Sequence, residues 1–148
     1  QNMQTNDPNI YAIGDCTNFN YGSRNIRLES IQNAVDQSKT AALNILNIKD
    51  NYKPIPWFWS DQFDLKLQIV GLNTNSNERQ DVRILGSKSN LKFSHFIFEN
   101  DRLICIESVN SPAHHLLLRN NYKIWKSIKP SMISENLDLK LFLKKLTQ

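Results

Sequence analysis

The segment that most constrains the fold is residues 5–15, because it joins a short apolar run to a glycine turn and a carboxylate. Pro8 fixes its own φ and has no backbone donor, so a strand can begin only after it. Residues 10–13 are therefore predicted to form a buried strand that ends at Gly14. A glycine there lets the backbone approach a ligand, and Asp15 offers two acceptor oxygens to sugar-type hydroxyls. The alternative is that Gly14 and Asp15 form an ordinary turn.

A helix of about 17 residues is predicted to follow Ser30, whose hydroxyl can accept from a free N–H of the first turn. Residues 16–27 before it are polar and rich in Asn, and we expect them to form an irregular surface loop. The unpaired N–H groups and the positive dipole end of the helix would favour an anionic group. Spacings of three and four predict one buried face, made of Ile31, Ala34, Val35, Ser38, Ala41, Ala42 and Ile45.

A second unit is predicted after the polar residues 48–54, where Pro54 and Pro56 indicate an extended linker. The aromatic cluster of residues 57–59 comes next, and alternating apolar residues then predict a strand that runs toward Gly71. Adjacent aromatic rings bury a large apolar area, so anchoring a core is one interpretation of this cluster. A functional role for Trp59 is the other.

The rest of the chain predicts an antiparallel sheet followed by helices. Residues 81–85, 91–99 and 102–109 are rich in Val, Ile and Phe, with Asn100 and Asp101 suited to a tight turn. Ser111 and Pro112 are expected to open a helix that extends to about Trp125. A break at residues 129–130 precedes a last helix with Leu139, Leu141, Phe142 and Leu146. The predicted fold class is α+β: a strand, loop and helix, then an antiparallel sheet flanked by C-terminal helices.

Composition and charge are those of an ordinary soluble globular protein, with 40% hydrophobic and 22% charged residues. No apolar run approaches the roughly 20 residues of a membrane span, and the N-terminal residues lack the order of a signal peptide. We therefore expect a cytoplasmic protein. The net charge of +4 comes from scattered Lys and Arg, which favours a solvated surface over nucleic-acid binding. It would also steer an acidic redox protein toward the chain.

Cysteine and histidine do not indicate a metal centre. Cys16 and Cys105 are far apart in the sequence, and there is no Cys-x-x-Cys redox pair. His114 and His115 are adjacent, so they would face different sides of a helix, and no acidic or cysteine ligand stands at a suitable spacing. We expect no metal ion in this chain.

Residues 5–15 resemble the second flavin-binding motif of two-dinucleotide-domain flavoproteins, in which a Thr, an apolar strand and Ala-x-Gly-Asp follow one another. Two further segments resemble one family more specifically: residues 27–34, RLESIQNA, and residues 56–62, PWFWSDQ. Both are similar to FAD-dependent ferredoxin reductases of the putidaredoxin reductase and rhodocoxin reductase type, within the pyridine nucleotide-disulphide oxidoreductase superfamily. The likeness runs over nearly the whole chain.

The resemblance implies that FAD is the cofactor and NAD(P)H the electron donor. It implies that Asp15, next to Gly14, binds the ribityl chain of FAD and that the backbone N–H of Ile31 faces the pyrimidine edge of the flavin. Trp59 would lie near the isoalloxazine, on the face used by the iron–sulfur partner. No catalytic side chain is expected, because a hydride moves directly between the two rings.

The chain departs from the family in having only four glycines and no Gly-x-Gly-x-x-Gly. We therefore expect the C-terminal part of a longer reductase, whose N-terminal domains bind the nucleotides. Residues 1–50 would be the incomplete end of the FAD-binding domain, and residues 54–148 the reductase C-terminal α+β domain. The implied function is transfer of a hydride from NAD(P)H to FAD and of single electrons to a ferredoxin-type iron–sulfur protein.

Two alternatives to this function remain. The isolated chain could be a non-catalytic module that forms a homodimer or docks a partner. It could also belong to a related FAD oxidoreductase of the apoptosis-inducing-factor or nitrite-reductase type, although residues 56–62 fit the ferredoxin reductases better.

Overall fold

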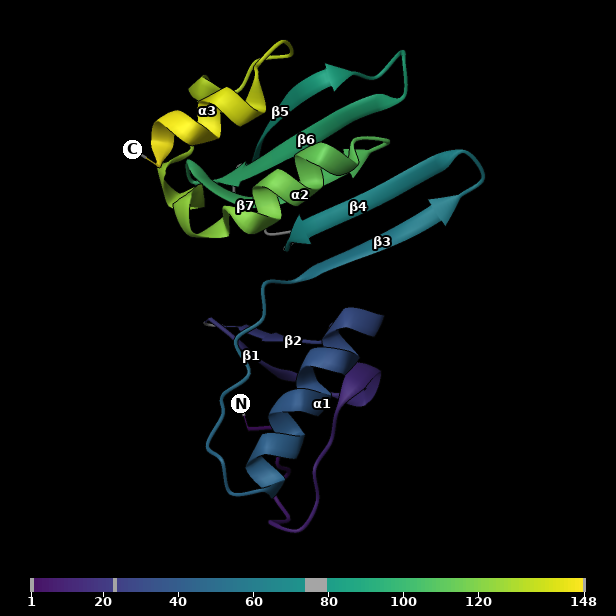
Figure 1. Cartoon of the computed structure of the whole chain (residues 1–148), viewed down its shortest axis with the longest axis vertical. Coiled ribbons are helices and arrows are strands. Elements are labelled where there is room, and N and C mark those ends of the chain that lie inside the picture. Colours follow the sequence, from purple (N-terminus) through teal and green to yellow (C-terminus); the bar gives the residue numbers. More distant parts are fainter. Residues whose placement is uncertain (1, 23, 74–79, 148) are drawn as a thin grey trace. The chain divides into compact units, whose positions relative to one another are not determined.

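The protein forms two compact units, Gln1–Phe58 and Trp59–Gln148, in a computed structural model that describes residues 2–22, 24–73 and 80–147. The division comes a few residues after Pro54 and Pro56. Figure 1 shows a single long helix in the first unit and a sheet with helices in the second.

The first unit contains a 3₁₀ turn, a short hairpin and a helix (Figure 1). The antiparallel hairpin corrects the prediction of an irregular loop at residues 16–27, and it pairs Phe19 with Ile26. It forms because Phe19 packs with Met3, Ala41 and Tyr52 in the core of this unit, and that burial outweighs the polar composition of the segment. The elements are η1 (Gly14–Cys16), β1 (Phe19–Tyr21), β2 (Arg24–Ile26) and α1 (Ile31–Ile45).

The predicted buried strand at residues 10–13 is wrong. Tyr11 forms an isolated bridge with Gln4, while Ile10 and Ile13 are exposed. Within the described residues, the segment pairs only with residues 3–5, so no sheet forms around it. The described residues therefore leave Ile10 and Ile13 without a covering layer.

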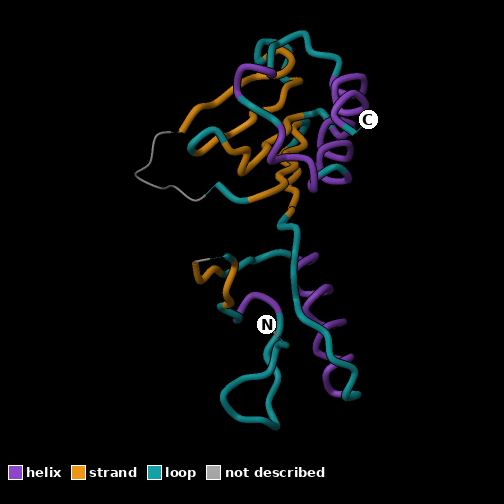
Figure 2. Tube along the Cα trace, turned by 90° about the vertical axis from the view of Figure 1, so that its left-hand side faces the viewer, coloured by secondary structure: helices purple, strands orange, loops and turns teal. Residues whose placement is uncertain are grey.

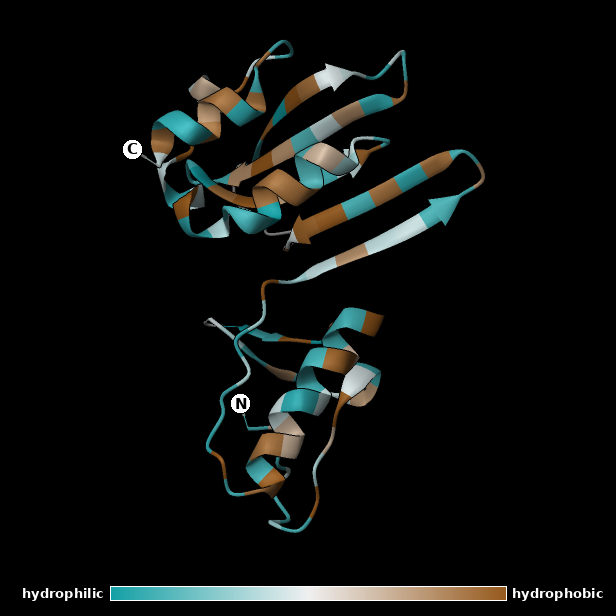
Figure 3. Cartoon of the chain, in the orientation of Figure 1, coloured by the Kyte–Doolittle hydropathy of each residue, from teal (hydrophilic) through white to brown (hydrophobic). Residues whose placement is uncertain are grey.

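Helix α1 confirms the predicted cap but not the predicted face. The Ser30 hydroxyl accepts from the backbone N–H of Asn33 at 3.2 Å. Ile31 is 69% exposed and Val35 42% exposed, so the large apolar side chains of the predicted face point away from their own unit, whereas Ala41 is buried as predicted. Both polar and apolar bands run along the helix in Figure 3. The residues that are buried are Asn33, Gln37, Thr40 and Ala41.

The second unit is built on a five-stranded sheet in the order β3-β4-β7-β6-β5. The pairings of β4 with β7, β7 with β6 and β6 with β5 are antiparallel, which confirms the predicted sheet. Most helical turns of this unit lie on one side of the strands in Figure 2. The strands are β3 (Trp57–Gln62), β4 (Leu65–Gly71), β5 (Gln80–Ser87), β6 (Lys92–Glu99) and β7 (Arg102–Val109).

The predicted turn between β6 and β7 is confirmed, because Asn100 and Asp101 have φ of 49° and 60°. The core of the unit lies between the sheet and the helices that follow it. Its fully buried side chains include Phe96 and Phe98 of β6, Ile106 of β7 and Leu118.

The C-terminal helices are α2 (Pro112–Asn120) and α3 (Leu139–Leu146), with 3₁₀ turns η2 (Tyr122–Ser127) and η3 (Pro130–Met132) between them. Helix α2 ends before Trp125, earlier than predicted. The Asn121 side chain donates to the carbonyl of Leu117 at 2.8 Å, and the Trp125 indole donates to that of Leu118 at 3.0 Å. These bonds satisfy the last carbonyls and turn the chain back over the helix end. Helix α3 confirms the prediction.

Candidate functional site

The predicted turn at Gly14 and Asp15 is present as η1. Gly14 is buried and has a φ of +78°, a left-handed conformation that favours glycine. A Cβ at this position would lie 3.5 Å from the Cβ of Ala34, in the first turn of α1. Asp15 is exposed at the centre of η1. The fold therefore brings the predicted carboxylate to the start of the predicted helix.

A buried glutamine connects this turn to the helix. Gln37 is 0% exposed, its Oε1 accepts from the backbone N–H of Gly14 at 2.7 Å, and the Thr17 hydroxyl oxygen lies 3.1 Å from that Oε1. Thr17 closes the turn, since its backbone N–H and its hydroxyl lie 3.0 and 2.8 Å from the Gly14 carbonyl oxygen. Sequence reasoning missed Gln37. The spacing of the polar residues 33, 37 and 40 is the signal that could have found it.

Asn33, Gln37 and Thr40 form a buried polar stripe along α1, and this stripe also binds the segments before and after the helix. Asn33 donates to the carbonyl of Leu28 at 2.8 Å and accepts from the Tyr52 hydroxyl at 2.6 Å. Burial, with a smaller contribution from the charge of Asp36, raises the pKa of Tyr52 to about 12. Thr40 donates to the Asp50 carboxylate at 2.6 Å. These bonds fix the chain before and after α1 against the helix.

Ile31, the third predicted site residue, is the first residue of α1. The Ser30 cap accepts from the N–H of Asn33, and the Ser30 carbonyl accepts from that of Ala34 at 3.1 Å. Neither bond uses the backbone N–H of Ile31. Such an N–H, at the positive end of a helix, can donate to a polar edge of a ligand.

Trp59 belongs to the second unit, where it lies on β3 at the edge of the sheet. It is 43% exposed and its neighbour Phe58 is 40% exposed, so neither is a core residue of the described chain. The interpretation of these two rings as core anchors is wrong for the described residues, which leave both side chains exposed on an edge strand. An indole exposed to this degree can contact another molecule or domain.

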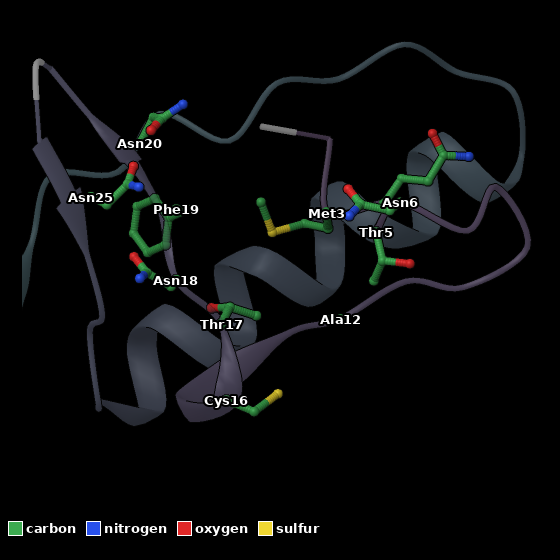
Figure 4. Close-up of a pocket in the computed structure, with 11 residues that line it drawn as sticks. Met3, Thr5, Asn6, Ala12, Cys16, Thr17, Asn18, Phe19, Asn20 and Asn25 are labelled. Carbon is green, nitrogen blue, oxygen red and sulfur yellow. The ribbon is translucent and has the colours of Figure 1, made fainter.

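The first unit also contains an open pocket of about 480 Å³ (Figure 4). Polar side chains, among them those of Thr5, Asn6, Asn18 and Asn25, line it together with the apolar Met3 and Phe19. None of the four predicted site residues belongs to its lining. Cys16, next to Asp15, does line it.

Two titratable groups of the second unit, Cys105 and His115, are buried in their neutral forms. Burial, aided by Arg119, lowers the pKa of His115 to about 4, and burial with Glu107 raises that of the Cys105 thiol to about 12. His114 Nδ1 lies 3.0 Å from the Ser94 hydroxyl, and burial lowers its pKa as well. A buried neutral imidazole and a protonated thiol are poorly suited to acid–base or nucleophilic work near neutral pH.

The described residues contain neither a metal-binding cluster nor a helix that could span a membrane. No three side chains of His, Cys, Asp or Glu in them are grouped so that they could hold a metal ion. Over the same residues, no helix has both the length and the apolar character needed to span a membrane.

Residues 57–144 match the model of the Reductase C-terminal family, and the chain therefore belongs to this family. Rhodocoxin reductase of Rhodococcus erythropolis is 37% identical over 142 residues, which cover 94% of this chain and 33% of that protein. Putidaredoxin reductase of Pseudomonas putida is 35% identical over 115 residues, 76% of this chain and 26% of that protein. The resemblance stated from the sequence is confirmed.

A solved structure shares the fold of the whole chain. The ferredoxin reductase for the CYP199A2 system from Rhodopseudomonas palustris has a TM-score of 0.86 at 41% identity, covering 100% of this chain and 36% of that one. The match to the covalent putidaredoxin reductase–putidaredoxin complex has a TM-score of 0.79 at 32% identity. It covers 99% of this chain and 34% of that one. The relatives are ferredoxin reductases, and this chain spans about a third of their length.

Proposed function

We propose that this chain is the C-terminal part of an FAD-containing ferredoxin reductase, which takes a hydride from NAD(P)H and passes single electrons to a ferredoxin-type iron–sulfur protein. The observation that carries the proposal is the match to a ferredoxin reductase of known structure over all of this chain at 41% identity. Under this proposal, residues 1–50 complete an FAD-binding domain and residues 54–148 form the reductase C-terminal domain. The cytoplasmic location and a homodimer stay predictions.

The residues present fit a flavin nucleotide. The exposed carboxylate of Asp15, on a turn held against α1, would accept hydrogen bonds from the ribityl hydroxyls. Gly14 leaves the backbone without a side chain beside that position, and the backbone N–H of Ile31 would donate to the edge of the ring. FAD, when bound, supplies the ring that accepts two electrons and releases them singly. The indole of Trp59 would exclude water on the side of the partner protein.

The isolated chain supports a second, narrower function. It has four glycines and no Gly-x-Gly-x-x-Gly loop to hold a pyrophosphate. Taken alone, the 148 residues would therefore act as a docking module without catalytic activity. Titration with FAD, followed by flavin fluorescence, should show no stoichiometric binding at micromolar concentration, and such binding would contradict this narrower function.

Replacing Trp59 by Phe in the full-length reductase tests the proposed electron exit. Because Trp59 is 43% exposed in its unit, we expect the melting temperature to stay nearly unchanged. Reduction of the flavin by NAD(P)H should persist in stopped-flow measurements. Steady-state reduction of the ferredoxin should fall by about threefold or more, since the contact and the spacing at the exit change.

Phe58→Leu provides the matched control, because adjacent residues of a strand point to opposite faces and Phe58 is exposed to a similar degree. We expect it to leave ferredoxin reduction unchanged. An unaltered ferredoxin rate in a stable Trp59→Phe protein, or an equal loss in both variants, would contradict the assignment of Trp59. A wild-type protein that holds no flavin would contradict the proposed function itself.

A further inference from the structure

We propose that Gln37 is a positioning residue for the flavin site. Its side-chain oxygen holds η1 in the conformation that presents the Asp15 carboxylate to the ribityl hydroxyls of FAD. This inference rests on the proposed function and assigns a role to a buried residue that never touches the cofactor.

The geometry of η1 gives Gln37 this role. The Asp15 carboxylate forms no hydrogen bond or ion pair with the described residues, so the backbone of η1 alone sets its direction. Thr17 closes the turn on itself through the Gly14 carbonyl. Among the described residues, the Gln37 oxygen, which accepts from the Gly14 N–H and lies 3.1 Å from the Thr17 hydroxyl, is the hydrogen-bonding link between this turn and helix α1.

The orientation of the Gln37 amide follows from its partners. The backbone N–H of Gly14 is a donor, so the amide oxygen must face it and Nε2 must point the other way. Nε2 is buried and has no partner within the described part of the chain. Leaving a buried donor unsatisfied is unfavourable, and a Met side chain of similar size would avoid that penalty. The favourable contribution of Gln37 must therefore come from its oxygen, through the turn that it holds.

Thr40, three residues after Gln37 on the same helix, supplies a matched control. Thr40 lies one turn further along the same buried stripe and is 4% exposed, and its hydroxyl bonds Asp50 on a different segment. Thr40→Val and Gln37→Met each remove a side-chain hydrogen bond made by a buried residue of α1. Only Gln37→Met removes the acceptor of the Gly14 N–H.

The test measures the dissociation constant of FAD for the full-length reductase, by reconstituting the apoprotein and following flavin fluorescence. Gln37→Met should weaken FAD binding by up to about tenfold, because losing one hydrogen bond lowers the equilibrium constant for forming the competent turn by about that factor. Gln37→Glu keeps an acceptor oxygen in either protonation state and should bind within about threefold of wild type. Thr40→Val should lower the melting temperature without changing the FAD dissociation constant. Equal FAD affinities for Gln37→Met and Thr40→Val would overturn the inference.

A double-mutant cycle shows whether Gln37 acts through Asp15. In the Asp15→Ala background the carboxylate is gone, so adding Gln37→Met should weaken FAD binding by less than about twofold. An undiminished effect of Gln37→Met in that background would overturn the inference, because Gln37 would then act independently of Asp15. If Asp15→Ala alone leaves FAD binding unchanged, the proposed role of Asp15 and the inference both fail. If Asp15→Ala weakens binding and Gln37→Met does not, the inference fails alone.

Discussion

The last residue of β4 provides a sharp test of the packing in the second unit. Gly71 has a φ of +84° and pairs with Cys105 of β7. A Cβ at Gly71 would overlap the carbonyl oxygen of Ile104, and it would lie 3.0 Å from Cζ3 of Trp125 and 3.1 Å from Cα of Cys105. Two of these three neighbours are backbone atoms of the central strand, so they cannot move without disturbing the sheet.

The expected cost of Gly71→Ala has three parts. The left-handed backbone costs about 1–2 kcal/mol for an L-residue, and forcing extra volume into a packed core costs about 1–3 kcal/mol. The hydrogen bond from the Leu72 N–H to the Ile104 carbonyl, 3.1 Å long, lies at the point of overlap, and losing it adds about 1 kcal/mol. We expect Gly71→Ala to destabilise the protein by about 3–6 kcal/mol.

Gly22→Ala separates the steric part from the conformational part. Gly22 also has a positive φ, +63°, but a Cβ there would meet nothing within 4 Å, so the loss should be about 1–2 kcal/mol. Urea unfolding of the chain, followed by far-UV circular dichroism, which reports on the helix of the first unit and on the sheet of the second, gives the free energy of unfolding of each variant. Losses that agree within about 0.5 kcal/mol would refute the reasoning, because Ile104 would then be able to move aside freely.

Two further predictions concern buried titratable groups. Tyr52→Phe should lower the free energy of unfolding by about 1–3 kcal/mol at neutral pH, because Asn33 loses its 2.6 Å bond from the Tyr52 hydroxyl; equal urea midpoints would contradict this. Folding lowers the pKa of His115 from 6.5 to about 4, so the folded state resists protonation of this side chain. The free energy of unfolding should therefore be highest above pH 6.5 and should fall by about 3 kcal/mol as the pH drops from 6.5 toward 4. His115→Leu should flatten this acid dependence relative to wild type, leaving the part due to His114, whose pKa is lowered too; unfolding curves between pH 4 and 7 make the comparison.

The elements that the sequence predicted well depend on neighbouring residues alone. The Ser30 hydroxyl caps a helix through a bond to Asn33, three positions along the chain. Asn100 and Asp101 form the hairpin turn because both side chains tolerate positive φ. The strands β6 and β7 were likewise predicted from their own content of Val, Ile and Phe, which favour extended backbone. The resemblance in residues 5–15, 27–34 and 56–62 was likewise present in the sequence alone.

Tertiary structure decided which side of each element is buried. The periodicity of α1 predicted an apolar core face, yet Gln37 is buried and Ile31 is exposed, because the segments around the helix offer N–H and hydroxyl groups to its polar side. The aromatic run of β3 could have anchored a core, and its place at the sheet edge leaves Trp59 exposed. Periodicity shows that a helix or strand has two unlike faces. Which face is covered depends on residues far away in the sequence, and only the folded chain brings those residues together.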